Sequence, residues 1–155
     1  MKAVVCERYG PPEVLRLEEV AKPVPKDNEV LIKIRATTVH IGDSKIRRLS
    51  PGMGFPLDPL VKVIMLLVVG FRGPRRKILG MEFSGVIEET GRSVTRFNKG
   101  DEVFAGTEML FGAYAEYKCM KETDSKHGCL ALKPENLTYE ESTVAAYGGL
   151  LALQF

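Results

Sequence analysis

This sequence has little net charge, few cysteines and no recognisable leader segment, three features that often indicate a protein's partners or cellular compartment. The 22 lysine and arginine residues nearly balance the 20 aspartate and glutamate residues, and the net charge is +2. So small an excess does not indicate a polyanionic partner, and we expect no nucleic-acid binding. The three cysteines cannot all pair with one another, and no apolar signal segment with a cleavage site follows Met1. We therefore expect a reducing, cytoplasmic setting.

Long apolar runs are missing as well. The longest, Leu60–Val69, is interrupted by Lys62 and is about half of the roughly 20 residues that a membrane helix needs. We expect it to be a core or interface helix and expect no membrane partner. Hydrophobic residues make up 45% and charged residues 27% of the 155 residues, which is average for a globular domain. The composition predicts one domain with a real core and excludes disordered, collagen-like and coiled-coil chains.

The sequence does contain a series of short strand patterns, separated by proline and glycine turns. Residues 2–8 are rich in β-branched side chains, and a Pro-Pro turn separates them from Val14 and Leu17, which predicts a hairpin-like opening. The period-two alternation over Glu29–Val39 predicts the clearest strand. Further strands are predicted in four segments: Met81–Thr90, Asp101–Ala105, Tyr114–Met120 and Cys129–Leu132. Many short strands with glycine turns favour a barrel.

Two helices and a basic loop are predicted between the strands near residues 39 and 81. The first helix covers residues 43–48, and we expect Asp43 to cap it, while the second covers Leu57–Val69. The loop Arg72–Lys77 holds four positive charges in six residues. A solvated surface loop is the favoured interpretation, because no aromatic residues alternate with the charges. The alternative is a site for a cofactor phosphate or an acidic partner.

The C-terminal segment has the pattern of a third helix. Thr138 and Glu141 have the spacing of a capping box, which predicts a helix start at Tyr139. The apolar residues that follow run to the end without a cap or breaker, so we expect the chain to stop inside this helix. We also expect the helix to expose an apolar face that a further domain would cover, formed by Val144, Leu150, Leu151, Leu153 and Phe155.

Five segments, taken together and in order, resemble the N-terminal, GroES-like domain of the medium-chain dehydrogenase/reductases. They are Met1–Leu15, Asn28–Ile34, Gly80–Ile87, Arg96–Phe104 and Phe111–Tyr117. The resemblance implies an α+β, mainly β fold: a GroES-like, partly open β-barrel with short peripheral helices, over residues 1–137. Residues 138–155 are similar to the start of the helix that leads to the family's nucleotide-binding domain, which is absent from this chain. No Gly-x-Gly-x-x-Gly fingerprint follows any strand, as this division implies.

The resemblance also allows the family's zinc-ligand positions to be compared with this sequence. Zinc-dependent members carry Gly-His-Glu where this chain has Gly80-Met81-Glu82, and a cysteine ligand where it has His40. A thioether is a poor ligand of Zn²⁺, and a catalytic zinc normally needs three N, O or S ligands. The cluster of four cysteines that binds a structural zinc in some members is missing too. We therefore expect no zinc, as in the quinone oxidoreductase branch, although His40 and Ile41 stand where that branch usually has Asn-Pro.

Four residues are predicted to form the catalytic site: His40, Asp43, Ser44 and Glu82. The His40 imidazole would donate a hydrogen bond to a substrate carbonyl, and a structural histidine bonded to backbone is an equal alternative. For Asp43, capping the helix is favoured over contact with substrate. Glu82 is expected to pair with an arginine or with backbone donors. Without zinc, developing oxyanion charge must be met by hydrogen-bond donors, for which His40 and Ser44 are the candidates.

The resemblance implies the substrate domain of an NADPH-preferring oxidoreductase, which transfers hydride to or from a small carbonyl, quinone or enone substrate. Cofactor contacts are predicted for Ile41, Tyr147 and Leu151, and the absent domain would bind most of NADPH, so we expect this chain alone to be inactive. Two alternatives stay open: a zinc-dependent alcohol dehydrogenase with an altered metal site, and a non-catalytic binding or structural module. Besides a small-molecule substrate, a homodimer is a possible partner. His127 lies in a polar loop and is expected to have no role.

Overall fold

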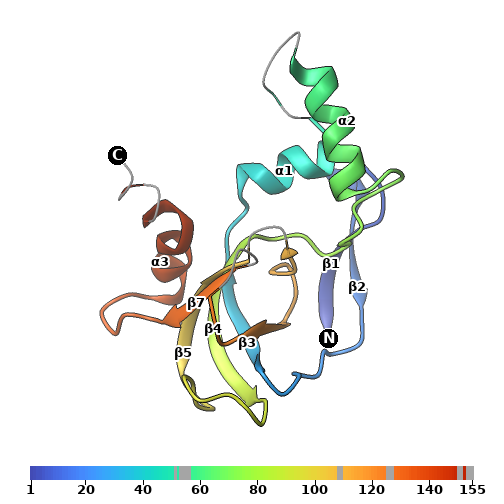
Figure 1. The fold of residues 1–155 in the computed structure, drawn as a ribbon. Coiled ribbons are helices and arrows are strands. Elements are labelled where there is room, and N and C mark those ends of the chain that lie inside the picture. Colours follow the sequence, from blue (N-terminus) through green and yellow to red (C-terminus); the bar gives the residue numbers. More distant parts are fainter. Residues whose placement is uncertain (51, 53–56, 108–109, 125–127, 150–151, 153–155) are drawn as a thin grey trace.

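The structure is a computed structural model that describes residues 1–50, 52, 57–107, 110–124, 128–149 and 152. Figure 1 shows a curled antiparallel sheet with a two-stranded hairpin beside it and helices outside it. This architecture confirms the predicted mainly β, partly open barrel with short peripheral helices. Within the described ranges, no helix has the length and apolar character needed to cross a membrane.

The N-terminal hairpin pairs β1 (Lys2–Cys6) with β2 (Leu15–Glu19). The antiparallel register runs from Lys2 opposite Glu19 to Cys6 opposite Leu15. One 3₁₀ turn, Pro12–Val14, connects the strands, because the ring of a proline at the first position holds φ near a helical value. The predicted hairpin-like opening is confirmed.

The main sheet has five antiparallel strands in the order β6-β3-β4-β5-β7. These strands are β3 (Glu29–Thr37), β4 (Glu82–Thr90), β5 (Glu102–Gly106), β6 (Tyr117–Lys121) and β7 (Cys129–Leu132). Each predicted strand is present. The strand predicted to begin at Tyr114 begins three residues later, at Tyr117, because the residues before it bond elsewhere.

Residues 113–116 join the hairpin to the main sheet. The Val4 N–H donates to the Tyr114 carbonyl oxygen (2.8 Å), and the Ile34 N–H donates to the Glu116 carbonyl oxygen (2.9 Å). The segment thus bonds to β1 on one side and to β3 on the other. An isolated bridge between Val5 and Ile78 adds a second link. Together these bonds curl the two sheets toward each other and leave the barrel only partly closed.

The main core lies inside the curled sheet and is formed by side chains from β3, β4, β5 and the loops between strands. Two further strands, β6 and β7, contribute one residue each, and the buried members are Val30, Ile32, Phe83, Ile87, Phe97, Val103, Ala105, Ala113, Met120 and Leu130. Burying one large apolar side chain contributes about 1.5–3 kcal/mol, so these residues dominate the stability of the barrel. A second, smaller cluster joins the hairpin to the helices: Cys6, Val14, Ile46, Val69, Leu79 and Phe111.

Gly85 lies where β3 and β4 approach most closely. A Cβ atom at this position would be 2.3 Å from the Lys33 carbonyl oxygen. Beside it, the register of the two strands shifts between Ile34 and Ala36, which marks a β-bulge. The bend of the sheet at this bulge therefore requires glycine.

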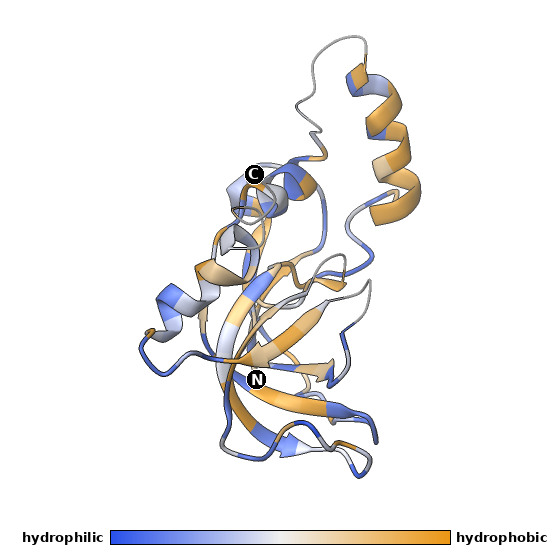
Figure 2. Cartoon of the chain, turned by 60° about the vertical axis from the view of Figure 1, so that its left-hand side comes forward, coloured by the Kyte–Doolittle hydropathy of each residue, from blue (hydrophilic) through white to orange (hydrophobic). Residues whose placement is uncertain are grey.

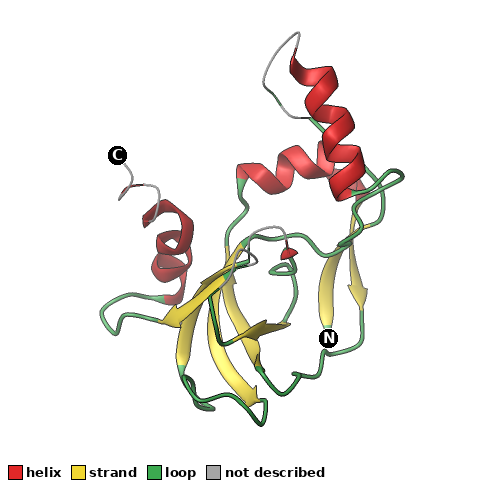
Figure 3. Ribbon diagram, viewed as in Figure 1, coloured by secondary structure: helices red, strands yellow, loops and turns green. Residues whose placement is uncertain are grey.

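The helices are α1 (Ile41–Arg48), α2 (Leu57–Val69) and α3 (Tyr139–Val144), and α3 continues as a π-helical turn, Ala145–Gly149. Figure 3 shows that the helices lie outside the yellow strands, with α1 and α2 at one end of the barrel and α3 at its side. All three helices occur where the sequence predicts them, and the π-helical turn was not predicted.

Hydrogen bonds fix both the start of α3 and its position on the barrel. The Thr138 hydroxyl accepts from the Glu141 N–H (3.2 Å), and the Glu141 carboxylate accepts from the Thr138 N–H (2.9 Å), which confirms the predicted capping box. The Thr143 hydroxyl donates to the Ser84 hydroxyl on β4 (2.8 Å), and both residues are buried. These bonds dock α3 against the sheet.

α2 is apolar but largely exposed, as its orange colour and its projection from the body in Figure 2 indicate. Seven large apolar side chains on it and just after it are 49–77% exposed: Leu57, Leu60, Val63, Ile64, Leu67, Val68 and Phe71. Its C-terminal end is anchored by Met65 and Val69 in the smaller cluster and by the Tyr9 hydroxyl, which donates to the Gly70 carbonyl oxygen (2.7 Å). The segment predicted as a core or interface helix is therefore not a core helix of this chain.

The predicted apolar face of the C-terminal helix is only partly described. Val144 is exposed, as expected. The other residues of that predicted face lie outside the described residues: Leu150, Leu151, Leu153 and Phe155.

Candidate active site

Three segments bring the predicted site residues together at the α1 end of the barrel. The chain leaves β3 through Thr38 and His40, enters the first turn of α1, and is faced by the start of β4 at Glu82. Antiparallel pairing of β3 with β4 places Thr37 opposite Phe83, so the end of one strand lies beside the start of the other. The predicted residues His40, Asp43 and Glu82 therefore come from neighbouring segments, as the sequence predicts.

His40, and not Asp43, caps α1. The His40 Nδ1 atom accepts a hydrogen bond from the Gly42 N–H (3.0 Å), which satisfies one of the donors that a helix start leaves unpaired. A nitrogen that accepts cannot carry the proton, so this bond requires the tautomer with hydrogen on Nε2. The His40 ring also lies edge-to-face against Tyr147 of the π-helical turn, with centroids 4.9 Å apart and an interplanar angle of 71°. Both contacts fix the orientation of the imidazole.

Asp43 instead points into the protein, and the prediction that it caps α1 is wrong. It is 3% exposed, and its carboxylate accepts from the Gly80 N–H (2.9 Å) and from the Tyr114 hydroxyl (3.0 Å). Burial raises the pKa of the Asp43 carboxyl above its usual value, while these two donors oppose that rise. Burial and the neighbouring Asp43 charge raise the pKa of Tyr114. The tyrosine therefore remains a hydrogen-bond donor.

The sequence predicts that Glu82 pairs with an arginine or with backbone donors, but the partner of its carboxylate in the structure is a hydroxyl. It is 4% exposed, and its carboxylate accepts from the Thr38 hydroxyl (3.2 Å). The Thr37 hydroxyl donates to the Glu82 carbonyl oxygen (2.7 Å), so two successive threonines hold this residue. Burial is the main cause that raises the pKa of the Glu82 carboxyl, and the nearby Asp43 charge adds to it.

The donor set beside His40 does not fit a catalytic zinc. A Cβ atom on Gly42 would lie 2.9 Å from His40 Nδ1 and 3.0 Å from the Met81 sulfur, so the two positions that correspond to zinc ligands in the family do lie together. His40 Nδ1 is already occupied as the helix cap, and the thioether of Met81 is a poor zinc ligand. Over the described ranges, no group of three His, Cys, Asp or Glu side chains could hold a metal ion.

The remaining predicted residues lie around this cluster. Ser44 is half-buried in the first turn of α1, where its Oγ atom faces Arg47 (3.5 Å). Ile41 directly follows His40 at the start of α1, and its side chain is 66% exposed. Leu151 and His127 lie outside the described residues.

Three residues of the site were not singled out by the sequence. They are Tyr114, Thr38 and the buried Arg47. Arg47 donates to the Gly10 carbonyl oxygen (2.6 Å), which ties α1 to the hairpin. Thr38 could have been found, because it follows the predicted strand by one residue and the strand containing Glu82 is its natural neighbour. Tyr114 is 71 residues from Asp43, and no local pattern connects them.

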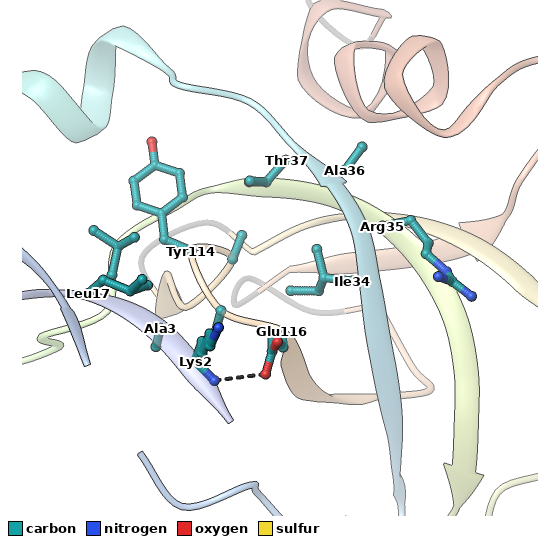
Figure 4. A pocket seen from close by; sticks show the side chains of 12 residues that line it. Lys2, Ala3, Leu17, Ile34, Arg35, Ala36, Thr37, Tyr114 and Glu116 are labelled. Carbon is teal, nitrogen blue, oxygen red and sulfur yellow. Dashed lines mark hydrogen bonds between the residues drawn. The ribbon is translucent and has the colours of Figure 1, made fainter. Parts of the chain in front are cut away.

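A cavity of about 330 Å³ lies beside this cluster, between the hairpin and β3 (Figure 4). Most of its lining is apolar, with Ala3, Leu17 and Ile34 among the labelled side chains. Tyr114 belongs to its wall, and Figure 4 shows the Tyr114 hydroxyl pointing toward α1, where Asp43 accepts its hydrogen bond. His40, Asp43 and Glu82 do not line this cavity. The predicted site and the cavity are thus adjacent but separate.

Comparisons with known proteins agree with this fold. A family model described as the alcohol dehydrogenase GroES-like domain matches residues 26–149. The chain is 37% identical over 118 residues to the quinone oxidoreductase of Sus scrofa, across 76% of this chain and 30% of that protein. It is 31% identical over 155 residues to the mitochondrial NAD(P)H oxidoreductase RTN4IP1 of Dictyostelium discoideum, across 98% of this chain and 39% of that protein. The solved quinone oxidoreductase of Coxiella burnetii matches with a TM-score of 0.75 and 31% identity, across 99% of this chain and 43% of its own.

The curled barrel with its peripheral helices is thus a GroES-like domain of the medium-chain dehydrogenase/reductase class. The chain belongs to the alcohol dehydrogenase GroES-like domain family, and within that class it is similar to the quinone oxidoreductases. It spans between 30% and 43% of the length of the relatives named above.

Proposed function

We propose that this chain is the substrate domain of an NAD(P)H-dependent oxidoreductase that transfers hydride to or from a carbonyl, quinone or enone without zinc. The observation that carries the proposal is the fixed His40 imidazole, held by the Gly42 N–H and by Tyr147 at the open end of the barrel. The 37% identity to a quinone oxidoreductase supports the substrate class, and a relative named as an NAD(P)H oxidoreductase supports the cofactor.

In the proposed reaction, His40 is the hydrogen-bond donor to the substrate oxygen. When hydride adds to the substrate, the electron pair of the C=O bond moves onto its oxygen, where negative charge develops. The bond at Nδ1 keeps the His40 proton on Nε2, so the imidazole presents a donor there without reorganising. Ser44, in the first turn of α1, is the second candidate donor. His40 keeps its proton and acts only as a hydrogen-bond donor, and a proton from solvent then completes the reduction to the alcohol, the hydroquinone or the saturated carbonyl.

Asp43 and Glu82 are positioning residues in this proposal. Asp43 holds the first turn of α1 against Gly80 and Tyr114, and Glu82 holds the end of β3 through Thr38. His40 lies between these two anchored points. A general acid or base role for either carboxyl is not needed.

NADPH, when bound, supplies the hydride. Ile41 directly follows His40 and is 66% exposed, and Tyr147 contacts the His40 ring, so both offer apolar surface near His40 that suits the flat ring of a nicotinamide. The chain carries no glycine fingerprint for the pyrophosphate, so we propose that residues beyond this chain bind most of the cofactor. Residues 1–137 then form the substrate domain, and residues 138–155 begin the connection to a nucleotide-binding domain.

The test uses the protein encoded by the complete reading frame, with NADPH and NADH, against a quinone, an enone and an aldehyde. We expect consumption of the reduced cofactor with at least one of the three. His40→Asn keeps a side-chain acceptor for the Gly42 N–H but loses the Nε2 donor, and we expect kcat to fall about 100-fold with little loss of stability. Arg92→Gln, on an exposed turn, is the matched control. Unchanged kcat in His40→Asn would refute the role of His40.

Two further measurements separate the proposal from its alternatives. Elemental analysis should find far less than one zinc per chain, and stoichiometric zinc that resists a chelator would favour the alcohol dehydrogenase alternative. If the complete protein oxidises neither cofactor with any substrate, a binding or structural module is the better description. Residues 1–155 alone should show no micromolar NADPH binding in calorimetry. The homodimer and the cytoplasmic location stay predictions.

A further inference from the structure

A second cavity, of about 440 Å³, lies away from the candidate active site and shares no lining residue with it. It is bounded by the basic loop after α2, by the start of β6 and by the loop at residues 110–112. The described residues that line it are Met1, Pro23, Arg75, Arg76, Lys77, Ile78, Leu110, Gly112, Tyr117, Lys118 and Cys119. Four of these side chains are cationic, and none of the described lining residues is acidic.

Lys118 is the most constrained of the four cations. Its ammonium group donates to the Phe111 carbonyl oxygen, which is a neutral partner. Burial and the positive charge of Arg76 lower the pKa of Lys118 to about 8, which shows that its charge is poorly compensated. Glu29 acts on it only weakly. An anion in the cavity would supply the missing counter-charge.

Gly112 is shaped to lie over this amine. Its φ of 95° is in the region that favours glycine, and a Cβ atom there would be 2.8 Å from Lys118 Nζ. The positive φ of Gly112 therefore lets the loop pass close beside Lys118 Nζ.

Arg75 and Arg76 lie at the rim of the cavity and are exposed. Within the described part of the chain, neither forms an ion pair, whereas Lys77 is paired with Glu7 (3.1 Å). Two guanidinium groups and one ammonium group thus remain to meet a ligand. Arginine binds phosphate through two parallel N–H bonds, and lysine adds a point charge.

We propose that this cavity binds a phosphate monoester through Arg75, Arg76 and Lys118. The cavity is larger than a free ion requires, and Ile78, Leu110 and Pro23 give it apolar walls, so the phosphate would carry a small organic group. The basic loop, for which a solvated surface is the favoured sequence interpretation, becomes a ligand-binding element. This site is independent of the proposed oxidoreductase activity.

The test is a titration of the chain with inorganic phosphate and with glycerol 3-phosphate, at constant ionic strength with chloride as reference. Calorimetry should show saturable binding of both, with glycerol 3-phosphate the tighter, and free glycerol should not bind. In a ¹H–¹⁵N spectrum the shifts should concentrate at Gly112 and Lys118. Arg76→Gln should weaken binding about 10- to 100-fold, the loss expected for a charge-assisted hydrogen bond.

The control Arg92→Gln removes the same charge from an exposed turn outside the cavity and should leave the affinity unchanged. Arg75 and Arg76 are exposed, so their substitution leaves the fold intact and keeps the test decisive if Lys118→Met fails to fold. The proposal is overturned if phosphate does not saturate, if Arg76→Gln and Arg92→Gln weaken binding equally, or if the shifts lie elsewhere. Binding only to anionic lipid vesicles, with no response to either soluble phosphate, would overturn it as well.

Discussion

β4 and α2 both carry large apolar side chains, but these side chains have opposite surroundings. Phe83 on β4 is fully buried between β3 and β5, whereas six large apolar side chains of α2 are 49–62% exposed: Leu57, Leu60, Val63, Ile64, Leu67 and Val68. β4 has hydrogen-bonded neighbours on both edges, whereas α2 packs on the smaller cluster at its C-terminal end, through Met65 and Val69. Hydrophobicity along the sequence therefore indicates which segments have apolar surface to bury. The topology decides whether this chain buries it.

The largest difference between the two regions should appear when one apolar side chain is truncated in each. Phe83→Ala should lower the free energy of unfolding by about 3–5 kcal/mol, because it leaves a cavity in the main core. Leu67→Ala on α2 should change it by less than about 0.5 kcal/mol, because the side chain is already mostly in solvent. Chemical denaturation measures both. A cost at Leu67 close to that at Phe83 would show that α2 is covered in solution.

A pair of tyrosines tests the polar contacts of the two regions. Tyr114→Phe removes a donor from the buried Asp43 carboxylate, and we expect a loss of about 1–3 kcal/mol. Tyr9→Phe removes the bond to the Gly70 carbonyl oxygen at the anchored end of α2, and a loss of about 0.5–1.5 kcal/mol is expected. Thermal unfolding compares the two variants. If Tyr9→Phe is the more damaging, the attachment of α2 matters more to the fold than the barrel contacts suggest.

The buried carboxyl of Glu82 should make the free energy of unfolding depend on pH. Because its folded-state pKa is raised, the folded state binds this proton more tightly than the unfolded state. Its stabilising contribution is full below the unfolded pKa of about 4.3 and is lost as pH rises through the raised value. Glu82→Gln removes this loss, so its stability relative to the native chain should improve from pH 4 upward. Asp43 titrates in both proteins, and the difference between them isolates Glu82. A difference that is flat with pH would contradict the assignment.

The smallest effect on stability, and a clear one on association, is expected from polar substitutions on α2. Exposed apolar surface of this extent promotes self-association, so the chain should associate as its concentration rises. The double variant Leu60→Ser, Leu67→Ser should reduce association in sedimentation experiments without a measurable change in unfolding free energy. Leu17→Ser, at an isolated exposed leucine on β2, is the control and should not alter it. Equal association of the native chain and the double variant would rule out this face.

The barrel was predictable because its signals are local. Alternation marked β3, glycine turns separated β4 and β5, and the Thr138–Glu141 capping box fixed the start of α3 to the residue. Alternation alone does not specify how the strands close into a barrel. That expectation came from the five segments that resemble the GroES-like domain.

The sequence indicated which side chains would lie near one another at the candidate site, but not the hydrogen bonds they form. His40, Asp43 and Glu82 do lie together, but the sequence assigned the helix cap to Asp43 because aspartate is the commoner cap. A histidine at the cap position competes only because its Nδ1 can reach the Gly42 N–H, and that freed Asp43 to turn inward. Its partner Tyr114 is reached through the pairing of distant segments, which no window of sequence contains.

The π-helical turn at Ala145–Gly149 has a consequence for everything that follows it. Such a turn amounts to one extra residue inserted into a helix, and each residue advances an α-helix by about 100°. Deleting one residue between positions 145 and 149 and restoring α-helical geometry would rotate later side chains by that angle. Tyr147 would lose its edge-to-face contact with His40. The length of this short turn, in single residues, therefore determines whether the Tyr147 ring contacts His40.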